Sequence, residues 1–189
     1  MGTSVSQPSP ATRNWEAAQS TYKSDIFPAD RVLQEIWRAA TNQDEGNIAT
    51  QLAAPIVNRL REIVQQGGKP IEVASAINRE IALSRQNSLG VEIARRAALQ
   101  SLSTENRNQA FSERLFAEAS NYLVSRDLSG FIGSEFRNKM VSDSLRFKQS
   151  VADAAVQSVN SVTASQGTTE TQWREYIAAV IQQFKERKR

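Results

Sequence analysis

The side chains that could do chemistry in this sequence are carboxylates, lysines, arginines and tyrosines, because the chain contains neither cysteine nor histidine. Without thiols, disulfides, cysteine-ligated zinc, iron–sulfur clusters and thiol nucleophiles are excluded. Without imidazole, the chain lacks the commonest general base and the usual Ser-His-Asp triad. We therefore expect a protein that is not an enzyme and that uses no cofactor and no metal, although carboxylate, lysine and tyrosine chemistry remains available.

Two short segments carry locally unbalanced positive charge and could contact the phosphates of a nucleic acid. Residues 137–148 hold four cations against one aspartate, and residues 185–189 hold four against one glutamate. These cations are Arg137, Lys139, Arg146, Lys148, Lys185, Arg187, Lys188 and Arg189. Because the second segment alone accounts for the net charge of +3, that charge reflects a basic tail and not a basic face. A nucleic-acid-binding accessory subunit is therefore an alternative function.

The first six residues, MGTSVS, match the pattern for N-myristoylation at Gly2. One acyl chain holds a membrane only marginally, and the basic tail could supply the second signal. A peripheral membrane protein acylated at Gly2 is thus a further alternative, while chance or an expression scar explains the same residues without any lipid. The sequence has no apolar window of roughly 20 residues and no secretory signal, so we expect a cytoplasmic protein.

Apolar residues recur at helical spacing through most of the chain, and glycines and prolines separate the apolar stretches. No stretch alternates apolar and polar residues over the length of a strand. We therefore predict an all-α fold, a compact irregular bundle of six to eight helices in a single domain over residues 15–189. Residues 1–14 are polar and contain two prolines, so we expect a disordered arm there.

Two boundaries between the predicted helices remain open in the sequence. Pro55 either kinks one helix over residues 48–64 or opens its second half as a first-turn residue. Residues 71–102 form either two helices with a break near residues 87–90 or one long bent helix.

Polar residues that could cap helices mark two further boundaries. Ser103 or Thr104 is expected to cap the helix that follows them. Thr169 and Gln172 have the spacing of a capping box, so the last helix is predicted over residues 169–185.

The terminal helix carries a surplus of large apolar residues on one face, next to a polar arm and a basic tail that cannot add to a core. This face consists of Trp173, Tyr176, Ile177, Val180, Ile181 and Phe184. Our main hypothesis is a non-catalytic helical adaptor or assembly subunit, which binds a protein partner or a second copy through Trp173, Ile177, Val180 and Phe184. The competing interpretation is that this face packs on the chain's own bundle. An enzyme built on carboxylates, Tyr122 or Tyr176 is the third class.

Two other features have structural interpretations that compete with nucleic-acid binding. Arg85 and Arg96 would share one side of a continuous helix, but Glu92 lies in the same row, at the favourable spacing for an ion pair with Arg96. Phe147 lies within the basic segment 137–148, yet its spacing aligns it with Val151, which predicts a core position and not base stacking.

Overall fold

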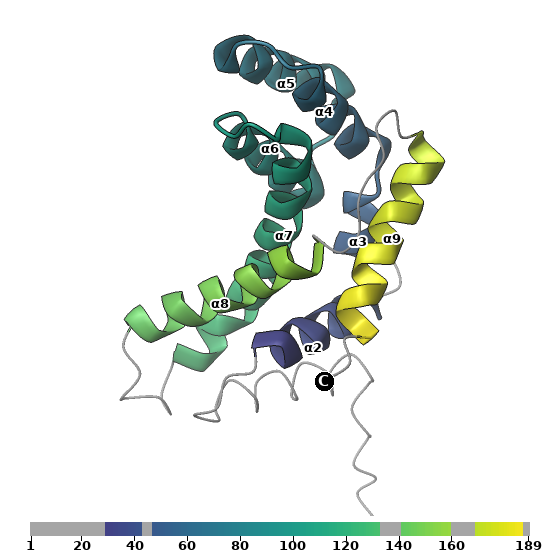
Figure 1. The fold of residues 1–189 in the computed structure, drawn as a ribbon. Helices are drawn as coiled ribbons and strands as arrows, with labels where there is room; N and C mark the ends of the chain where they lie inside the picture. The colour runs from purple at the N-terminus through teal and green to yellow at the C-terminus, as the bar shows by residue number, and fades with distance from the viewer. Residues whose placement is uncertain (1–28, 43–46, 133–140, 160–168, 187–189) are drawn as a thin grey trace, which may run out of the picture.

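The structure is a computed structural model that describes residues 29–42, 47–132, 141–159 and 169–186, with the side chains of 127–132 and 141–144 excepted. This part of the chain contains eight helices and no strand (Figure 1), which confirms the predicted all-α fold. The helices are α2 (Ala29–Thr41), α3 (Ile48–Leu52), α4 (Pro55–Gln65), α5 (Pro70–Ser84), α6 (Leu89–Ser101), α7 (Arg107–Ile132), α8 (Val141–Val159) and α9 (Glu170–Glu186). Within the described residues, no helix is both long and apolar enough to cross a membrane.

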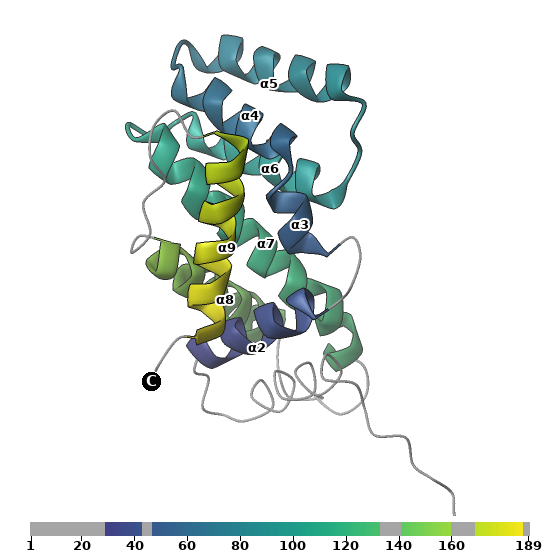
Figure 2. The ribbon, with the colours of Figure 1, turned by 90° about the vertical axis from the view of Figure 1, so that its right-hand side faces the viewer.

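The long helix α7 packs against α2, α4, α6 and α8, and α9 packs against α2, α3, α4 and α8. Figure 2 shows α9 lying across the other helices, with α2 at its lower end and α4 near its upper end. Helix α5 is outermost and rests on α4 and α6 (Figures 1 and 2). Helices α2 and α9, the first and the last of the described chain, thus pack against each other.

An aromatic cluster joins α2, α7 and α9 at the centre of the core. The ring centroid of Trp37 lies 5.4 Å from that of Phe184 and 6.2 Å from that of Phe116. The Trp37 indole N–H also donates a 2.9 Å hydrogen bond to the hydroxyl of Ser120. The buried indole thus keeps a polar partner, as the burial of a tryptophan requires.

Proline and glycine set the ends of the middle helices. Pro55 is the first residue of α4, where its missing N–H needs no partner, so the second of the two interpretations of Pro55 is confirmed. Gly67 and Gly68 follow α4 with φ of 76° and 111°, values at which a side chain would be strained. Pro70 then opens α5.

Residues 71–102 form two helices and not one bent helix. Helix α5 ends at Ser84, and Arg85 adopts the left-handed conformation with φ 52° and ψ 21°. Ser88 then caps α6, its side chain accepting a hydrogen bond from the backbone N–H of Val91. The break therefore lies at residues 85–88.

The predicted cap of α7 at Ser103 or Thr104 is wrong, because α7 begins only at Arg107 and both residues belong to the turn that follows α6. Thr104 donates to Ser101 at 2.7 Å and Ser103 to Gln100 at 3.4 Å. Asn106 acts as the cap instead, with its side-chain oxygen accepting from the N–H of Gln109 at 3.2 Å.

The predicted capping box of the last helix is confirmed in both directions. The N–H of Gln172 donates to the Thr169 hydroxyl at 3.2 Å, and the N–H of Thr169 donates to the Gln172 side chain at 2.9 Å. Predictions for the arm 1–14, Gly2, Arg137, Lys139 and the last three residues lie outside the described residues.

Helices α3 and α6 approach each other closely at Gly90, the second residue of α6. A Cβ atom placed on Gly90 would lie 2.5 Å from the Cβ of Gln51 and 2.9 Å from its backbone carbon. The N–H of Gly90 donates to the side chain of Gln51 at 2.8 Å. Since part of the obstacle is backbone, α3 would have to shift to admit a larger residue.

We predict that Gly90→Ala destabilises the protein by about 1–3 kcal/mol, since the overpacking outweighs the roughly 1 kcal/mol that alanine contributes to a helix. Urea unfolding followed by circular dichroism measures this. Ser75→Ala, at an exposed position of α5, is the control and should change stability by less than about 0.5 kcal/mol. An increase in the free energy of unfolding for Gly90→Ala would contradict the close approach.

Candidate functional site: a groove along α9

An apolar groove runs between α3 and the outer side of α9, with a volume of about 570 Å³. Ile177 and Ile181 form its floor. Only 1% of the surface of Ile177 and 5% of that of Ile181 is exposed. The remaining lining residues are Ala49, Thr50, Ala53, Ala54, Pro55, Arg174 and Ala178. We call this volume the apolar half of the groove.

Small side chains create the apolar half. Ala53 and Ala54 form the short connection between α3 and α4, and Ala178 projects outward from α9. Because an alanine extends only one carbon from the backbone, the backbones of α3 and α9 remain accessible on either side of the isoleucine floor. A second helix could approach such a surface closely.

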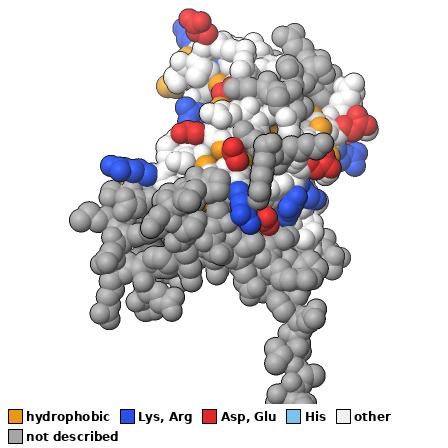
Figure 3. Space-filling view, turned by 60° about the horizontal axis from the view of Figure 1, so that its bottom comes forward, with side chains coloured by type: hydrophobic (Ala, Val, Ile, Leu, Met, Phe, Trp, Pro, Cys, Tyr) orange, Lys and Arg blue, Asp and Glu red, His pale blue; other side chains and the backbone are white. Residues whose placement is uncertain are grey.

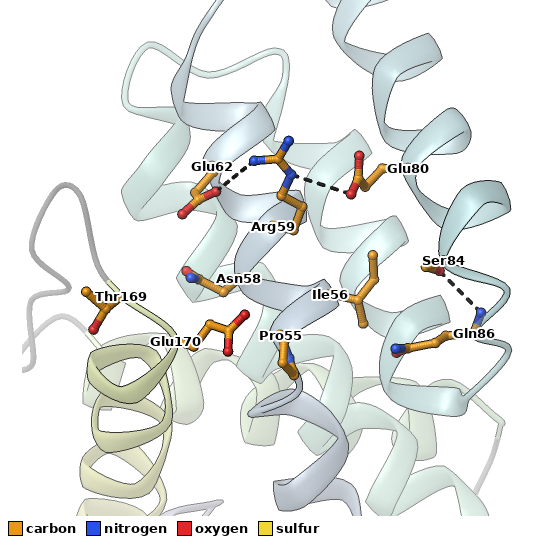
Figure 4. Close-up of a pocket in the computed structure, with 10 residues that line it drawn as sticks. All are labelled: Pro55, Ile56, Asn58, Arg59, Glu62, Glu80, Ser84, Gln86, Thr169 and Glu170. Carbon is orange, nitrogen blue, oxygen red and sulfur yellow. Dashed lines mark hydrogen bonds and ion pairs between the residues drawn. The ribbon is translucent and has the colours of Figure 1, made fainter.

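A second hollow of about 520 Å³ continues beyond Pro55, which lines both volumes. It is polar, and Figure 4 shows its residues contributed by α4, by α5 and the turn after it, and by the start of α9. They are Pro55, Ile56, Asn58, Arg59, Glu62, Glu80, Ser84, Gln86, Thr169 and Glu170. We call this volume the acidic half of the groove.

The acidic half has more carboxylates than cations. Arg59 lies between Glu62 and Glu80, with its nitrogens 3.4 Å from a carboxylate oxygen of each (Figure 4). Glu170, in the first turn of α9, is the third carboxylate. One arginine thus faces three glutamates, so the lining of this half carries a net charge of −2.

A buried arginine lies behind the acidic half and fixes the position of α4. The side chain of Arg61 is fully buried, and two of its nitrogens donate to the side-chain oxygen of Asn58 at 3.1 Å. Its third nitrogen donates to Gln65 at 3.1 Å and to Asn108 of α7 at 3.2 Å. Burial lowers the pKa of Arg61, while the nearby Glu62 opposes this effect. Since Asn58 lines the groove, Arg61 is a positioning residue for it.

Trp173 joins the groove to the core on the inner side of α9. Its indole N–H donates a 3.0 Å hydrogen bond to the carbonyl of Leu52, the last residue of α3. The guanidinium of Arg61 lies over its ring, 5.4 Å from the ring centroid, which is a cation–π geometry. Tyr176 packs beside it at 5.3 Å, and burial raises the pKa of this tyrosine.

The structure changes the interpretation of the four predicted docking residues. Trp173, Val180 and Phe184 have no exposed surface, so in this structure they contact the chain's own bundle and are not accessible to a partner. Of these four residues, Ile177 is the one that lines the groove. The hydrophobic periodicity identified the buried face of α9, and the groove runs along one edge of this face, where Ile177 and Ile181 border Ala178.

The basic residues predicted for nucleic-acid binding are described only in part. Arg146 is exposed, Lys148 and Lys185 are half-buried, and the other five lie outside the described side chains. Phe147 is buried, as predicted. On the face in Figure 3, described basic and acidic side chains lie interspersed rather than in one continuous positive stripe.

Glu92 pairs with both arginines that follow it on α6, which extends the predicted pair with Arg96. Its oxygens lie 2.9 Å from Arg95 and 3.1 Å from Arg96. The hydrogen bond from Arg95, followed by that from Arg96, lowers the pKa of Glu92 from 4.5 to about 2. These arginines are therefore engaged in ion pairs within the chain.

Comparisons with protein-family models, curated proteins and solved structures find no match to this chain. No relative therefore assigns a role to any residue of the groove. Among the described side chains, no group of three or more acidic residues is placed to hold a metal ion.

We predict that Trp173→Ala lowers the free energy of unfolding by about 3–5 kcal/mol, because it removes a buried indole and leaves the Leu52 carbonyl without this donor. Chemical denaturation measures the loss. Arg174→Ala changes the adjacent exposed residue on the same helix and should have an effect below about 0.5 kcal/mol. A well-folded Trp173→Ala protein with unchanged stability would show that the inner face of α9 is not part of the core.

We predict a small pH-dependent contribution from Glu92. Its lowered pKa means that the ion pairs stabilise the fold above about pH 4.5 and lose this effect as the pH falls through about 2. Because 43% of the Glu92 side chain is exposed, we expect Glu92→Gln to cost only about 0.5 kcal/mol at neutral pH. Thermal unfolding of both proteins at about pH 7 and about pH 2 should show this difference disappearing at the acidic pH. A difference that persists unchanged would contradict the assigned ion pairs.

Proposed function

We propose that this chain is a non-catalytic helical adaptor or assembly subunit that binds a protein partner along the groove on the outer side of α9. The observation that supports this proposal is the apolar half of the groove, in which two isoleucines lie at the bottom of a trough bordered by alanines. Concave apolar surfaces of this kind are typical sites for the apolar face of a partner helix.

The shape of the groove favours a helix over a small molecule. The two halves meet at Pro55, and the residues that α9 contributes to them run from Glu170 to Ile181. At a rise of 1.5 Å per residue this stretch is roughly 17 Å long, or about three helical turns. The partner would therefore contribute about eleven residues of helix, with small or branched apolar side chains facing Ile177 and Ile181.

The two exposed apolar residues of α5 do not form a comparable surface. Ile71 and Leu83 on α5 are 76% and 73% exposed, but their separation along the helix corresponds to roughly 18 Å and to a rotation of about 120°. They therefore cannot contact one flat partner surface together. Single exposed apolar residues are common on globular proteins.

A photo-crosslinking amino acid at Ala178 tests the proposal, with Ala179 as the matched control. Both alanines are exposed on α9 and adjacent in sequence, but only Ala178 lines the groove. In cells that make this protein, we expect a discrete crosslinked protein from position 178 and at least about tenfold less from position 179. Ala178→Glu should abolish the complex, because it places a carboxylate against apolar surface, whereas Ala179→Glu should not.

Equal crosslinking from both positions, or a complex that survives Ala178→Glu, would show that the groove is not the docking site. Circular dichroism of the two glutamate variants confirms that each remains folded. Both substitutions are made at exposed helix positions, where we expect changes in stability within about 0.5 kcal/mol.

A further inference from the structure

We infer that the occupant of the groove is a second copy of this chain, bound through the exposed side of its helix α8. This inference rests on the proposed function, because it names the partner of the same groove. It follows from the apolar pattern of α8, from its charges and from the length over which the two surfaces correspond.

Helix α8 carries an apolar stripe that its own bundle does not cover completely. Leu145 is 60% exposed, and Ala152 and Val156 are half-buried. Their spacing of seven and four residues puts them within about 40° of one another around the helix. The stripe is therefore a narrow ridge, which is the shape that a groove between two helices accepts.

The charges beside this stripe are opposite to those of the groove. Arg146 and Lys148 follow Leu145 in the sequence and flank the stripe around the helix, at about +100° and −60° from Leu145. Neither forms an ion pair with a described residue. The acidic half of the groove carries a net charge of −2. These two cations would therefore meet complementary charge at the end of the groove where Glu170 lies.

The two surfaces also correspond in length and direction. From Arg146 to Val156 the rise along α8 is about 15 Å, and from Glu170 to Ile181 the rise along α9 is about 17 Å. Laid parallel to α9, α8 of the second copy would put its cations at the acidic half and Val156 at the apolar half. In this register Asp153 lies within one turn of Arg174, the cation of the apolar half.

Such an assembly is head-to-tail, because the two surfaces lie on different parts of the molecule. The N-terminal end of α8 points away from α9 and α3 (Figure 1). Each copy would then offer one groove and one α8, so that association continues beyond a dimer or closes into a ring. The mass of the wild-type protein should accordingly rise with concentration above its monomer value of 21.0 kDa.

Two complementary variants test this inference in the full-length protein. Ala178→Glu blocks the groove and leaves α8 intact, while Leu145→Glu blocks α8 and leaves the groove intact. Light scattering coupled to gel filtration should find each variant alone as a monomer of 21.0 kDa. Their mixture should give a one-to-one complex of twice that mass, since each variant supplies the surface that the other lacks. Ala179→Glu is the control and should assemble like the wild type.

A charge exchange tests the register. Arg146→Glu with Lys148→Glu should weaken self-association about tenfold, as expected when two exposed ion pairs become repulsive. Adding Glu80→Lys and Glu170→Lys in the same chain should restore it, and the restored assembly should again weaken as salt screens the pairs. If Arg146→Glu and Lys148→Glu had merely damaged the fold, the two lysine substitutions would not restore self-association.

A wild-type protein that stays monomeric at all concentrations would overturn the inference, as would a mixture of the two variants that forms no heterodimer. If position 178 then crosslinks to a different protein, the proposed docking function stands and only the identity of the occupant is wrong. If position 178 crosslinks to nothing, both proposals fail.

Discussion

The hydrogen bond from the Trp173 indole to the Leu52 carbonyl is the contact on which the rest of the arrangement depends. Helix α3 ends at Leu52 ahead of Pro55, and carbonyls in the last turn of a helix have no partner within that helix. The indole, 121 residues further along the chain, satisfies this carbonyl in the buried interior. Because a buried unpaired carbonyl would cost about 1–3 kcal/mol, this bond fixes the position of α9 along its own axis relative to the end of α3. The groove exists at the line where these two helices meet.

Helix α9 both anchors itself in the core and lines the groove. Its inner face places Trp173 and Phe184 among the aromatic rings of α2 and α7, which provides the large apolar contact area that keeps an amphipathic helix docked. Along the groove it exposes the short side chain of Ala178 beside Ile177 and Ile181. A docking site built on a helix that is itself anchored by buried aromatics is rigid before any partner binds, which reduces the entropic cost of association.

The sequence predicted those features that depend on neighbouring residues. The capping box at Thr169 and the apolar face of α9 are encoded within a few positions of the chain, whereas Pro55 left both a kink and a helix start open. The start of α7 was misplaced because the chain makes a further turn after Thr104, and Asn106 supplies the capping oxygen directly before Arg107. The groove could not be predicted, because an alanine such as Ala53 has the same local pattern whether a neighbouring helix covers it or not. Its exposure is decided by α9, which is distant in sequence.

The partners of Arg61 explain how the groove keeps its negative charge. A buried arginine usually needs a carboxylate, and Glu62 is the next residue in the sequence. In this structure Arg61 is instead bound by the neutral side chains of Asn58, Gln65 and Asn108 and by the face of Trp173. No described carboxylate forms an ion pair with it, so Glu62 remains at the surface beside Arg59. Had the buried charge been neutralised by this glutamate, the acidic half would have lost one of its three carboxylates, and with it half of the net charge that a cationic helix could recognise.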